Sequence, residues 1–502
     1  MKKKTKGLIL AAFFAVILLT SVASVGLPRL NPPPESEEVT VTGTPADNFP
    51  DDQRAQFCGS EDAKSNTYIR EYEIQTKCTQ PLAITTDPDG NVWFAQVNTG
   101  KVAKFDPNTE LFTEYENPEW PPKARSMMWG IAYSPDGSLW FTDEAHDSVW
   151  KFSIEDGKYD RHGYPSTGDA LPQRLEISGS QIIINDFTGN KITFLDPVTQ
   201  SDGETAYHIV TSPLENSFTG AFAVDSDGNI WYTNWQFRQG GTLVKFDQKK
   251  YFEASALAKD AGVPLFDFIK VFQLPSMNAP NGISVGNDGI VWIADTSSSF
   301  FYSFDPSSEK FTKYITSKPD ISSYGNATGL IKTPVSGPYW ADFDQKGRLV
   351  FNEQSANRIG IFDPYTESLV EYNVPSKNPI WADCDPLADC GLAQVFDFTI
   401  QNDKIWFTEW VENNIAVLDT SIPLPFQIEL DQTEITLKKG EKAELSMKVI
   451  PSSAGKISFT SSNTAQFSDI VVDFDKYEQE ISGNEPASIS VTVEANNNAL
   501  SG

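Results

Sequence analysis

The hydrophobic positions of this chain fall in short runs that alternate with polar residues, and turn residues separate the runs. The stretch 89–107, DGNVWFAQVNTGKVAKFDP, holds a turn, an apolar run, a polar loop, a second run and another turn. Similar phrases return as DGSLWFTDEAHDSVWKFS, DGIVWIADTSSSFFYSFDP and NDKIWFTEWVENNIAVLD. This period of two predicts β-strands, because few windows show the 3.6-residue period of a helix.

The repeated phrases return at intervals of 43 to 61 residues, which is the period of a propeller blade or a solenoid unit. Each copy holds four short predicted strands. The sequence therefore predicts an all-β fold with a seven-bladed β-propeller. An open solenoid is the alternative, but its end repeats should be atypical. The centres of the seven apolar runs are Trp93, Trp140, Ile183, Trp231, Trp292, Val350 and Trp406.

The two ends of the repeat region point to a closed ring. Asn66–Ile74, NTYIREYEI, resembles the fourth strand of a copy but precedes the first complete copy. The seventh copy ends near Asp419 and lacks that strand. We expect the early strand to pair into the last blade, which removes exposed sheet edges. The insertion KKYFEASALAKDAGVPLFD is expected to form one short helix.

The remaining segments fall outside the propeller. Residues 1–29 combine a basic start with an uncharged apolar run, which predicts either a cleaved signal peptide or a membrane anchor. Residues 30–55 are rich in proline and acid and are expected to be a disordered linker. The propeller is assigned to 56–422. Residues 423–502 alternate without the aromatic phrase and predict a small immunoglobulin-like sandwich, either incomplete or completed by pairing elsewhere.

The net charge and the cysteines narrow the kinds of partner and the compartment that we expect for the protein. The net charge is -29 with scattered acids, so a nucleic-acid groove is not expected. The four cysteines form two local pairs, Cys58 with Cys78 and Cys384 with Cys390, which suits disulfides in an oxidising compartment. A zinc site is the alternative, but no nearby histidine completes it. We expect a secreted or cell-surface monomer that meets membrane only through its N-terminal segment.

An oxygen-bearing side chain lies three positions beyond every anchor, where the second strand of each copy reaches the mouth of the ring. Such a ring could hold Mg²⁺ or Ca²⁺, which prefer oxygen ligands. The alternative is that these groups accept hydrogen bonds from backbone amides at each blade top. The seven residues are Gln96, Asp143, Asp186, Asn234, Asp295, Glu353 and Glu409.

A second set of residues starts the innermost strands, nearer the axis. Trp129 and Tyr339 could stack on a flat or sugar-like ligand, and Arg174 could pair with a carboxylate. The alternative is that the aromatic side chains simply fill a tapering channel. The matching positions are Leu82, Trp129, Gly220, Asn281 and Tyr339, with Arg174 and Asp397 as the nearest candidates in the two copies of uncertain register.

The phrases GNVWF, IWFTEW and PNGISV, repeated over about residues 66–420, resemble those of the streptogramin lyases, the virginiamycin B lyase group. APNGISVGNDGIVWIAD is also similar to the gluconolactonase and senescence-marker propellers, which are related to NHL-type propellers. The lyase resemblance implies a seven-bladed fold, Mg²⁺ and a histidine base that opens a cyclic ester by elimination. It gives Glu409 a role in holding the metal, and the second resemblance gives one to Asn281.

The expected histidine base has no match. The corresponding stretch is QVFDFTI, with Phe396 or Asp397 in its place. Of the three histidines, His162 and His208 are predicted in outer fourth strands, and His146 at the mouth. His146 is either a relocated base or an incidental loop residue.

Two functions follow from these patterns. The first is an exported propeller that binds a small molecule or an envelope component at its channel mouth, with the tail domain as a spacer. The alternative is a divalent-metal-dependent carbon–oxygen lyase or lactonase that opens a cyclic ester. A purely structural role in a cell envelope is a third hypothesis.

Overall fold

The structure is a computed structural model. It describes Phe49 and residues 51–499, except 60–61, 167, 169, 180, 197–205, 238, 259–262, 321–322, 324–334, 383–389, 462–469, 483–484 and 498. The chain divides into two compact units. The first comprises Met1–Tyr314 and Pro319–Asp419, and the second Ile315–Lys318 and Thr420–Gly502. The predicted signal or anchor segment at 1–29 lies outside the described residues.

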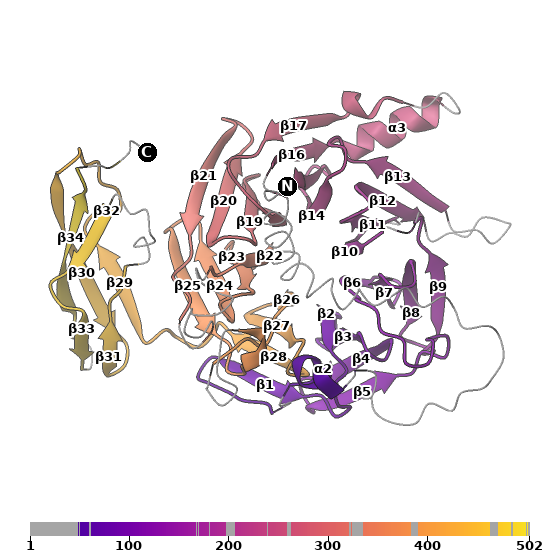
Figure 1. Ribbon diagram of the computed structural model, residues 1–502, viewed down its shortest axis with the longest axis horizontal. Helices are drawn as coiled ribbons and strands as arrows, with labels where there is room; N and C mark the ends of the chain where they lie inside the picture. Colours follow the sequence, from indigo (N-terminus) through magenta and orange to yellow (C-terminus); the bar gives the residue numbers. More distant parts are fainter. Residues whose placement is uncertain are drawn as a thin grey trace, which may run out of the picture. The chain divides into compact units, whose positions relative to one another are not determined.

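Seven four-stranded antiparallel sheets make up the first unit, and they surround a common axis (Figure 1). Blades one and two are β2 (Pro81–Thr86), β3 (Val92–Gln96), β4 (Lys101–Asp106) and β5 (Leu111–Tyr115), then β6 (Ile131–Ser134), β7 (Ser138–Asp143), β8 (Ser148–Ser153) and β9 (Tyr159–Gly163). Blades three and four are β10 (Pro172–Ser178), β11 (Gln181–Asp186), β12 (Lys191–Asp196) and β13 (Ala206–Thr211), then β14 (Phe218–Val224), β15 (Ile230–Gln236), β16 (Gly240–Phe246) and β17 (Ile269–Gln273). Blades five and six are β18 (Pro280–Val285), β19 (Val291–Asp295), β20 (Phe300–Asp305) and β21 (Lys310–Ile315), then β22 (Pro338–Phe343), β23 (Leu349–Glu353), β24 (Arg358–Asp363) and β25 (Ser368–Asn373). Blade seven is β26 (Phe398–Gln401), β27 (Lys404–Glu409), β28 (Asn414–Asp419) and β1 (Ile69–Glu73).

The predicted propeller is confirmed, and so is its closure. β1 comes first in the chain but pairs with β28 at the end, with Glu71 opposite Ala416. The inner strands of successive blades contact one another from blade one to blade six, and β2 of blade one also contacts β26 of blade seven. The N-terminal strand therefore completes blade seven, as the sequence predicts.

The repeated tryptophan has a local reason. Asp87 begins the turn before β3, and its carboxylate accepts hydrogen bonds from the Asn91 amide at 2.9 Å and from the Trp93 indole at 2.8 Å. Asp225 accepts a hydrogen bond from Trp231 in the same way, at 2.9 Å. The phrase Asp-x-Asp-Gly-Asn-x-Trp thus closes its own turn and fixes the indole that packs between blades.

The apolar core lies between neighbouring blades. Trp93 of blade one packs with Phe141 and Phe152 of blade two, and all three are buried. Across the closing seam, Phe105 of β4 packs with Trp406 of β27 at a ring distance of 5.7 Å. Both faces of second strands such as β3 and β7 are therefore buried between neighbouring blades, which explains the aromatic content of the repeats.

Side chains two positions beyond the anchors tie one blade to the next. Asn185 donates to the Thr219 carbonyl at 3.0 Å, and Asn352 donates to the Val395 carbonyl at 2.7 Å. Thr408 makes the equivalent bond across the closing seam, to the Leu82 carbonyl at 2.6 Å. The seam is therefore held by the same contact as the interior of the ring.

The N-terminal segment packs on the seam of blades seven and one. Helix α2 (Asp51–Phe57) precedes Cys58, which is disulfide-bonded to Cys78. Phe49 stacks on Phe57 at 4.8 Å, and the Trp381 indole of η4 (Pro379–Trp381) donates to the Gln56 carbonyl at 2.7 Å. Phe49 and helix α2 overlap the end of the predicted linker at 30–55, whose other residues lie outside the described part of the chain.

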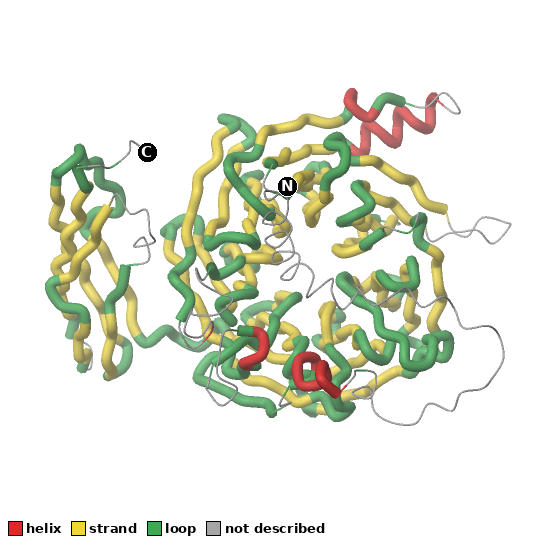
Figure 2. The backbone as a smooth tube through the Cα atoms, in the orientation of Figure 1, coloured by secondary structure: helices red, strands yellow, loops and turns green. Residues whose placement is uncertain are grey.

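The other cysteine pair is only partly described. Cys390 is disulfide-bonded, while Cys384 lies outside the described residues. The predicted helix of the blade-four insertion is confirmed as α3 (Gln248–Ala258), followed by η3 (Leu265–Asp267) (Figure 2).

The second unit has one four-stranded sheet and one two-stranded sheet. The larger sheet has the order β29 (Phe426–Leu430), β30 (Lys442–Pro451), β34 (Ala487–Ala495) and β32 (Ile470–Phe474), and the smaller is β31 (Gly455–Ser458) with β33 (Glu478–Ile481). Val449, Ile457 and Val491 belong to its shared core. The immunoglobulin-like assignment stays a prediction.

Within the described ranges, no helix combines the length and apolar character needed to cross a bilayer.

Candidate functional site

The residues predicted to line the axis lie where the inner strands bulge. Register shifts interrupt β2, β10, β14, β18 and β22 at their first residues, and the bulges contain Leu82, Arg174, Gly220, Asn281 and Tyr339. The side chain two positions beyond the anchor satisfies the bulged backbone, since Asn185 accepts from the Arg174 amide at 2.7 Å and Asn352 from the Trp340 amide at 2.8 Å. Bulges re-aim side chains, which explains why chemistry-bearing residues gather here.

Arg174 brings three blades together. Its guanidinium lies 3.7 Å from the Asp397 carboxylate of blade seven and 5.9 Å from the Trp340 ring of blade six. The Arg174 side chain is 33% exposed, whereas the Asp397 side chain is 5% exposed. Asp397 also accepts a hydrogen bond from the Ile84 amide of blade one, at 3.0 Å. The sequence predicted both residues for this position but not their pairing.

The charge of the Arg174 guanidinium also affects two further carboxyl groups, those of Glu176 and Asp342. Burial raises the pKa of Glu176 and that of Asp397 to about 7, and the charge of Arg174 opposes both shifts. Asp342 on β22 is solvent-exposed although protein surrounds it, as expected for a side chain that lines a channel. The surrounding protein raises its pKa, again against the charge of Arg174. The charge of Arg174 therefore acts on three carboxyl groups, and burial raises the pKa of two of them, Glu176 and Asp397, to about 7.

An aromatic wall adjoins this charged cluster. Tyr339 packs on Trp340 at 4.2 Å, and Trp129 of blade two meets the edge of Phe396 at 5.8 Å. The Trp129 indole donates to Glu144 at 2.8 Å. Burial raises the pKa of Glu144 to about 8, and the nearby charges of Asp143 and Asp186 add to the shift.

Asn281 lies apart from the Arg174 cluster in its contacts. Its amide donates to Thr296 at 3.3 Å, while its side-chain oxygen, on a residue 3% exposed, accepts no hydrogen bond from the described residues. Leu82 and Gly220 have no polar side chain to offer a ligand. A Cβ on Gly220 would lie 2.2 Å from the Thr233 hydroxyl, so the backbone packs closely there.

The seven oxygen-bearing residues beyond the anchors are buried, each at most 1% exposed. Asp186 accepts from the Leu171 and Gly189 amides, both at 2.8 Å, and Asp295 accepts from the Ala279 amide at 2.8 Å. Asn234 accepts from the Leu214 amide at 2.7 Å. The Leu171, Ala279 and Leu214 amides lie in the connections that enter blades three, five and four, so these three ring members bond backbone amides, as in the alternative that the sequence left open.

The remaining ring members have side-chain partners of their own. Gln96 donates to Glu114 at 3.0 Å, and Glu353 pairs with Arg358 at 2.6 Å. Burial raises the pKa of Glu353 to about 8, while Arg358 opposes the shift. The part of the chain that the structure describes has no group of three or more His, Cys, Asp or Glu residues placed to hold a metal ion. The metal-binding role of these residues stays a prediction.

Glu409 is fully buried beside a second carboxyl group, that of Glu71 on β1. Asn414 donates to one Glu409 oxygen at 3.1 Å. Burial raises the pKa of Glu409 well above its usual range, and the charge of Glu71 adds to the shift. Glu71 is held in turn by Ser376, whose amide and hydroxyl donate at 2.8 and 2.6 Å.

His146 forms a dyad with a ring member. Its Nδ1 lies 2.9 Å from both carboxylate oxygens of Asp143, and its side chain is 22% exposed. Asp143 also accepts from the Trp150 indole at 2.9 Å, and Trp120 meets the imidazole edge-on at 5.0 Å. The predicted catalytic candidate is thus oriented by a carboxylate, an arrangement that fixes the tautomer of a general base.

Residues 63–301 match the model of the virginiamycin B lyase family. The solved virginiamycin B lyase of Staphylococcus aureus is similar in fold, at 20% identity over 71% of this chain and 99% of that chain, with a TM-score of 0.51. A streptogramin B lyase structure gives 21% identity over 70% and 97%, with a TM-score of 0.52. The first unit is a virginiamycin B lyase-like propeller.

A third solved structure is a catalytically inactive histidine-to-alanine variant of the S. aureus lyase with quinupristin, at 19% identity over 71% and 99% and a TM-score of 0.52. None of the curated proteins matches the chain.

In this virginiamycin B lyase-like propeller, the two residues that replace the expected base differ in surroundings. Phe396 is 2% exposed and packs against Trp129 and, at 5.4 Å, against Trp410. Asp397 belongs to the Arg174 cluster. His162 and His208 lie on β9 and β13, the outer strands where the sequence predicted them.

Sequence reasoning missed Glu176, Trp340 and Asp342 as members of the Arg174 cluster. A signal was present, because each lies within three residues of a position chosen for the inner ring. The repeat template gave one position per blade, whereas Glu176 and Asp342 lie further along the same inner strands, in regular register beyond the bulges. The N-terminal aromatic segment left no signal in the repeat pattern.

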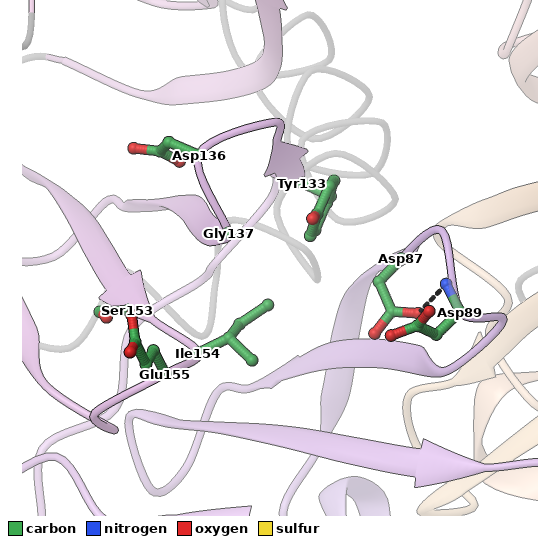
Figure 3. Close-up of a pocket in the computed structure, with 8 residues that line it drawn as sticks. All are labelled: Asp87, Asp89, Tyr133, Asp136, Gly137, Ser153, Ile154 and Glu155. Atoms are coloured by element: carbon green, nitrogen blue, oxygen red, sulfur yellow. Dashed lines mark hydrogen bonds between the residues drawn. The ribbon is translucent and has the colours of Figure 1, made fainter.

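A pocket of about 250 Å³ lies between the turns of blades one and two, away from the Arg174 cluster (Figure 3). Asp87, Asp89 and Asp136 line it. Asp87 turns toward its own loop, accepting the Asp89 amide at 3.0 Å, and Asp136 pairs with Lys151 at 2.9 Å. These acids serve their turns, so the pocket is not part of the candidate site.

Proposed function

We propose that this protein is an exported or cell-surface propeller that binds a small molecule or an envelope component at its channel mouth. The observation that carries the proposal is the Arg174 cluster: its guanidinium lies 3.7 Å from the Asp397 carboxylate and near the Trp340 ring, and its charge also acts on Glu176 and Asp342. Charged groups that are only partly paired and lie next to aromatic faces are typical of a recognition site on a rigid scaffold.

Export rests on separate features. The N-terminal apolar segment is a sequence feature, and the Cys58–Cys78 disulfide is consistent with an oxidising compartment. Phe396, in place of the histidine that the family resemblance leads us to expect, favours binding over proton abstraction at that position, because a phenyl ring takes up no proton.

The test is a screen of the purified full chain against metabolites and cell-wall fragments, read by tryptophan fluorescence, since Trp129 and Trp340 adjoin the cluster. A genuine ligand should lose at least about tenfold in affinity, or about 1.4 kcal/mol, in Arg174→Gln and in Trp340→Leu. Arg70→Gln is the matched control, because Arg70 pairs with Glu110 on an exposed surface. Equal ligand affinities in all three variants would show that the ligand does not bind at the channel mouth.

The second candidate function is a carbon–oxygen lyase or lactonase that opens a cyclic ester. The observation that favours it is the His146–Asp143 dyad, with the imidazole partly exposed at a blade top. A neutral imidazole whose Nδ1 proton is held by Asp143 would leave Nε2 to take a proton next to an ester.

Quinupristin is the probe for this second function, because it accompanies the similar S. aureus structure. Elimination opens the ring without a change of mass, whereas a lactonase adds one water, so chromatography with mass spectrometry separates the two outcomes. Arms with EDTA, Mg²⁺ and Ca²⁺ test the metal requirement. His146→Gln should abolish ring opening and His162→Gln should not. If both variants keep the activity, the base is another residue.

A further inference from the structure

Arg125 lies in the connection from blade one to blade two and stacks on the N-terminal segment. Its guanidinium is 3.9 Å from the centre of the Phe49 ring and 5.9 Å from that of Phe57. Phe49 is 2% exposed and Phe57 7% exposed, while Arg125 keeps an accessible portion. A guanidinium stacked on an aromatic face is covered on one side, and its N–H groups point outward in its own plane.

The loop holds Arg125 in place from both sides. Ala124 donates to the Pro121 carbonyl at 3.0 Å and accepts from the Trp120 indole at 3.1 Å. Ser126 donates from its amide to the Val97 carbonyl at 3.2 Å and from its hydroxyl to Asp143. The guanidinium is therefore preorganised, and a partner would bind without first ordering the loop.

No described residue accepts a hydrogen bond from the Arg125 guanidinium or forms an ion pair with it. Burial lowers its pKa to about 10, so the group remains charged at neutral pH. A largely buried cation without a partner is costly, and arginines in this situation are normally paired with a carboxylate or phosphate. The chain has 68 Asp and Glu against 39 Lys and Arg, so a shortage of carboxylates does not explain why no described carboxylate pairs with Arg125.

We propose that Arg125 is the anchor of an anion-binding subsite, which takes the carboxylate or phosphate group of a ligand against the edge of its guanidinium. Lys123, two residues away, is exposed and adds a second positive charge. The subsite uses neither Arg174 nor His146, although Ser126, next to Arg125, donates to Asp143 of the His146 dyad. Because the whole protein carries a charge of -29, anions are repelled from its general surface, and saturable binding must be local.

The experiment follows the arginine Nε–Hε resonances of the full chain by NMR during titration at constant ionic strength. Benzoate and inorganic phosphate are the two probes, and benzamidinium is the cationic match for benzoate. We expect saturable shifts with one or both anions at a Kd on the order of 1 mM, and none with benzamidinium. No saturation by either anion up to about 100 mM would overturn the proposal.

Variants separate anion binding from a merely structural contact with Phe49. Arg125→Gln should abolish saturation, and Arg70→Gln, which removes an equal charge from an exposed ion pair, should leave the Kd unchanged. Arg125→Lys keeps the charge but loses the planar fork, so its Kd should rise at least about fivefold. If Arg125→Gln does not fold, the lysine variant decides; an unchanged Kd there would refute the subsite.

Discussion

Thr408 on β27 donates a hydrogen bond of 2.6 Å to the carbonyl of Leu82 on β2, 326 positions away in the sequence. Thr233 makes the equivalent bond to the Pro280 carbonyl, between blades four and five, at 2.5 Å. The seam where the ring closes is thus built like its interior, and one repeated side chain joins the last blade to the first.

The closing bond should be measurable. Thr408→Val keeps the shape and leaves the buried Leu82 carbonyl without its donor, so we expect a loss of about 1 to 3 kcal/mol in the free energy of unfolding. Urea denaturation followed by tryptophan fluorescence measures it. Thr233→Val is the matched interior variant and should lose a similar amount of stability. If Thr233→Val is destabilised but Thr408→Val is not, the pairing of β1 with β28 is what holds the ring closed.

The Glu71–Glu409 pair makes stability depend on pH. The pKa of Glu409 is raised in the folded state, so folding favours its protonated form. Its contribution is present in full below the ordinary glutamate pKa and is lost as pH rises toward the folded value. Glu409→Gln should therefore be more stable than the wild type at pH 8 and nearly equal to it at pH 4. Thermal melts across this range check the prediction, and equal pH dependence of both proteins would contradict it.

The Cys58–Cys78 disulfide links the N-terminal segment to the start of blade one across a separation of 20 residues. Replacing both cysteines by serine should cost about 2 to 5 kcal/mol and should expose the segment after Phe49 to protease. Denaturation under oxidising conditions and limited proteolysis measure the two effects. A double variant with wild-type stability and wild-type cleavage would show that the aromatic contacts of Phe49 and Phe57 are sufficient.

Gly282 permits close contact between blades five and six. A Cβ at this position would lie 1.7 Å from the Tyr339 carbonyl, so Gly282→Ala should cost at least about 3 kcal/mol by separating the two inner strands. Gly163 has nothing within 4 Å of the corresponding atom, and Gly163→Ala should change stability by less than about 0.5 kcal/mol. Denaturant unfolding of both variants makes the comparison; a tolerated Gly282→Ala would mean that the blades can shift.

The sequence by itself determined the repeat, the strand period and the closure of the ring. Trp93 and Asp87 are six residues apart, and their hydrogen bond depends only on the turn between them, so the phrase that repeats in the sequence also repeats in space. The pairing of β1 with β28 could be predicted for a similar reason, because the missing and the surplus strand were both visible in the pattern.

Only the tertiary structure decided what the polar residues contact. Asp186 and Asp295 end their strands at the predicted positions, yet they accept bonds from connection amides. Arg174, in the bulge of β10, meets Asp397, more than 200 positions away, which lies immediately before β26. Alternation fixes which face of a strand is buried, but the partner of a buried polar group depends on contacts between blades that are distant in sequence, and a repeat pattern carries no information about them.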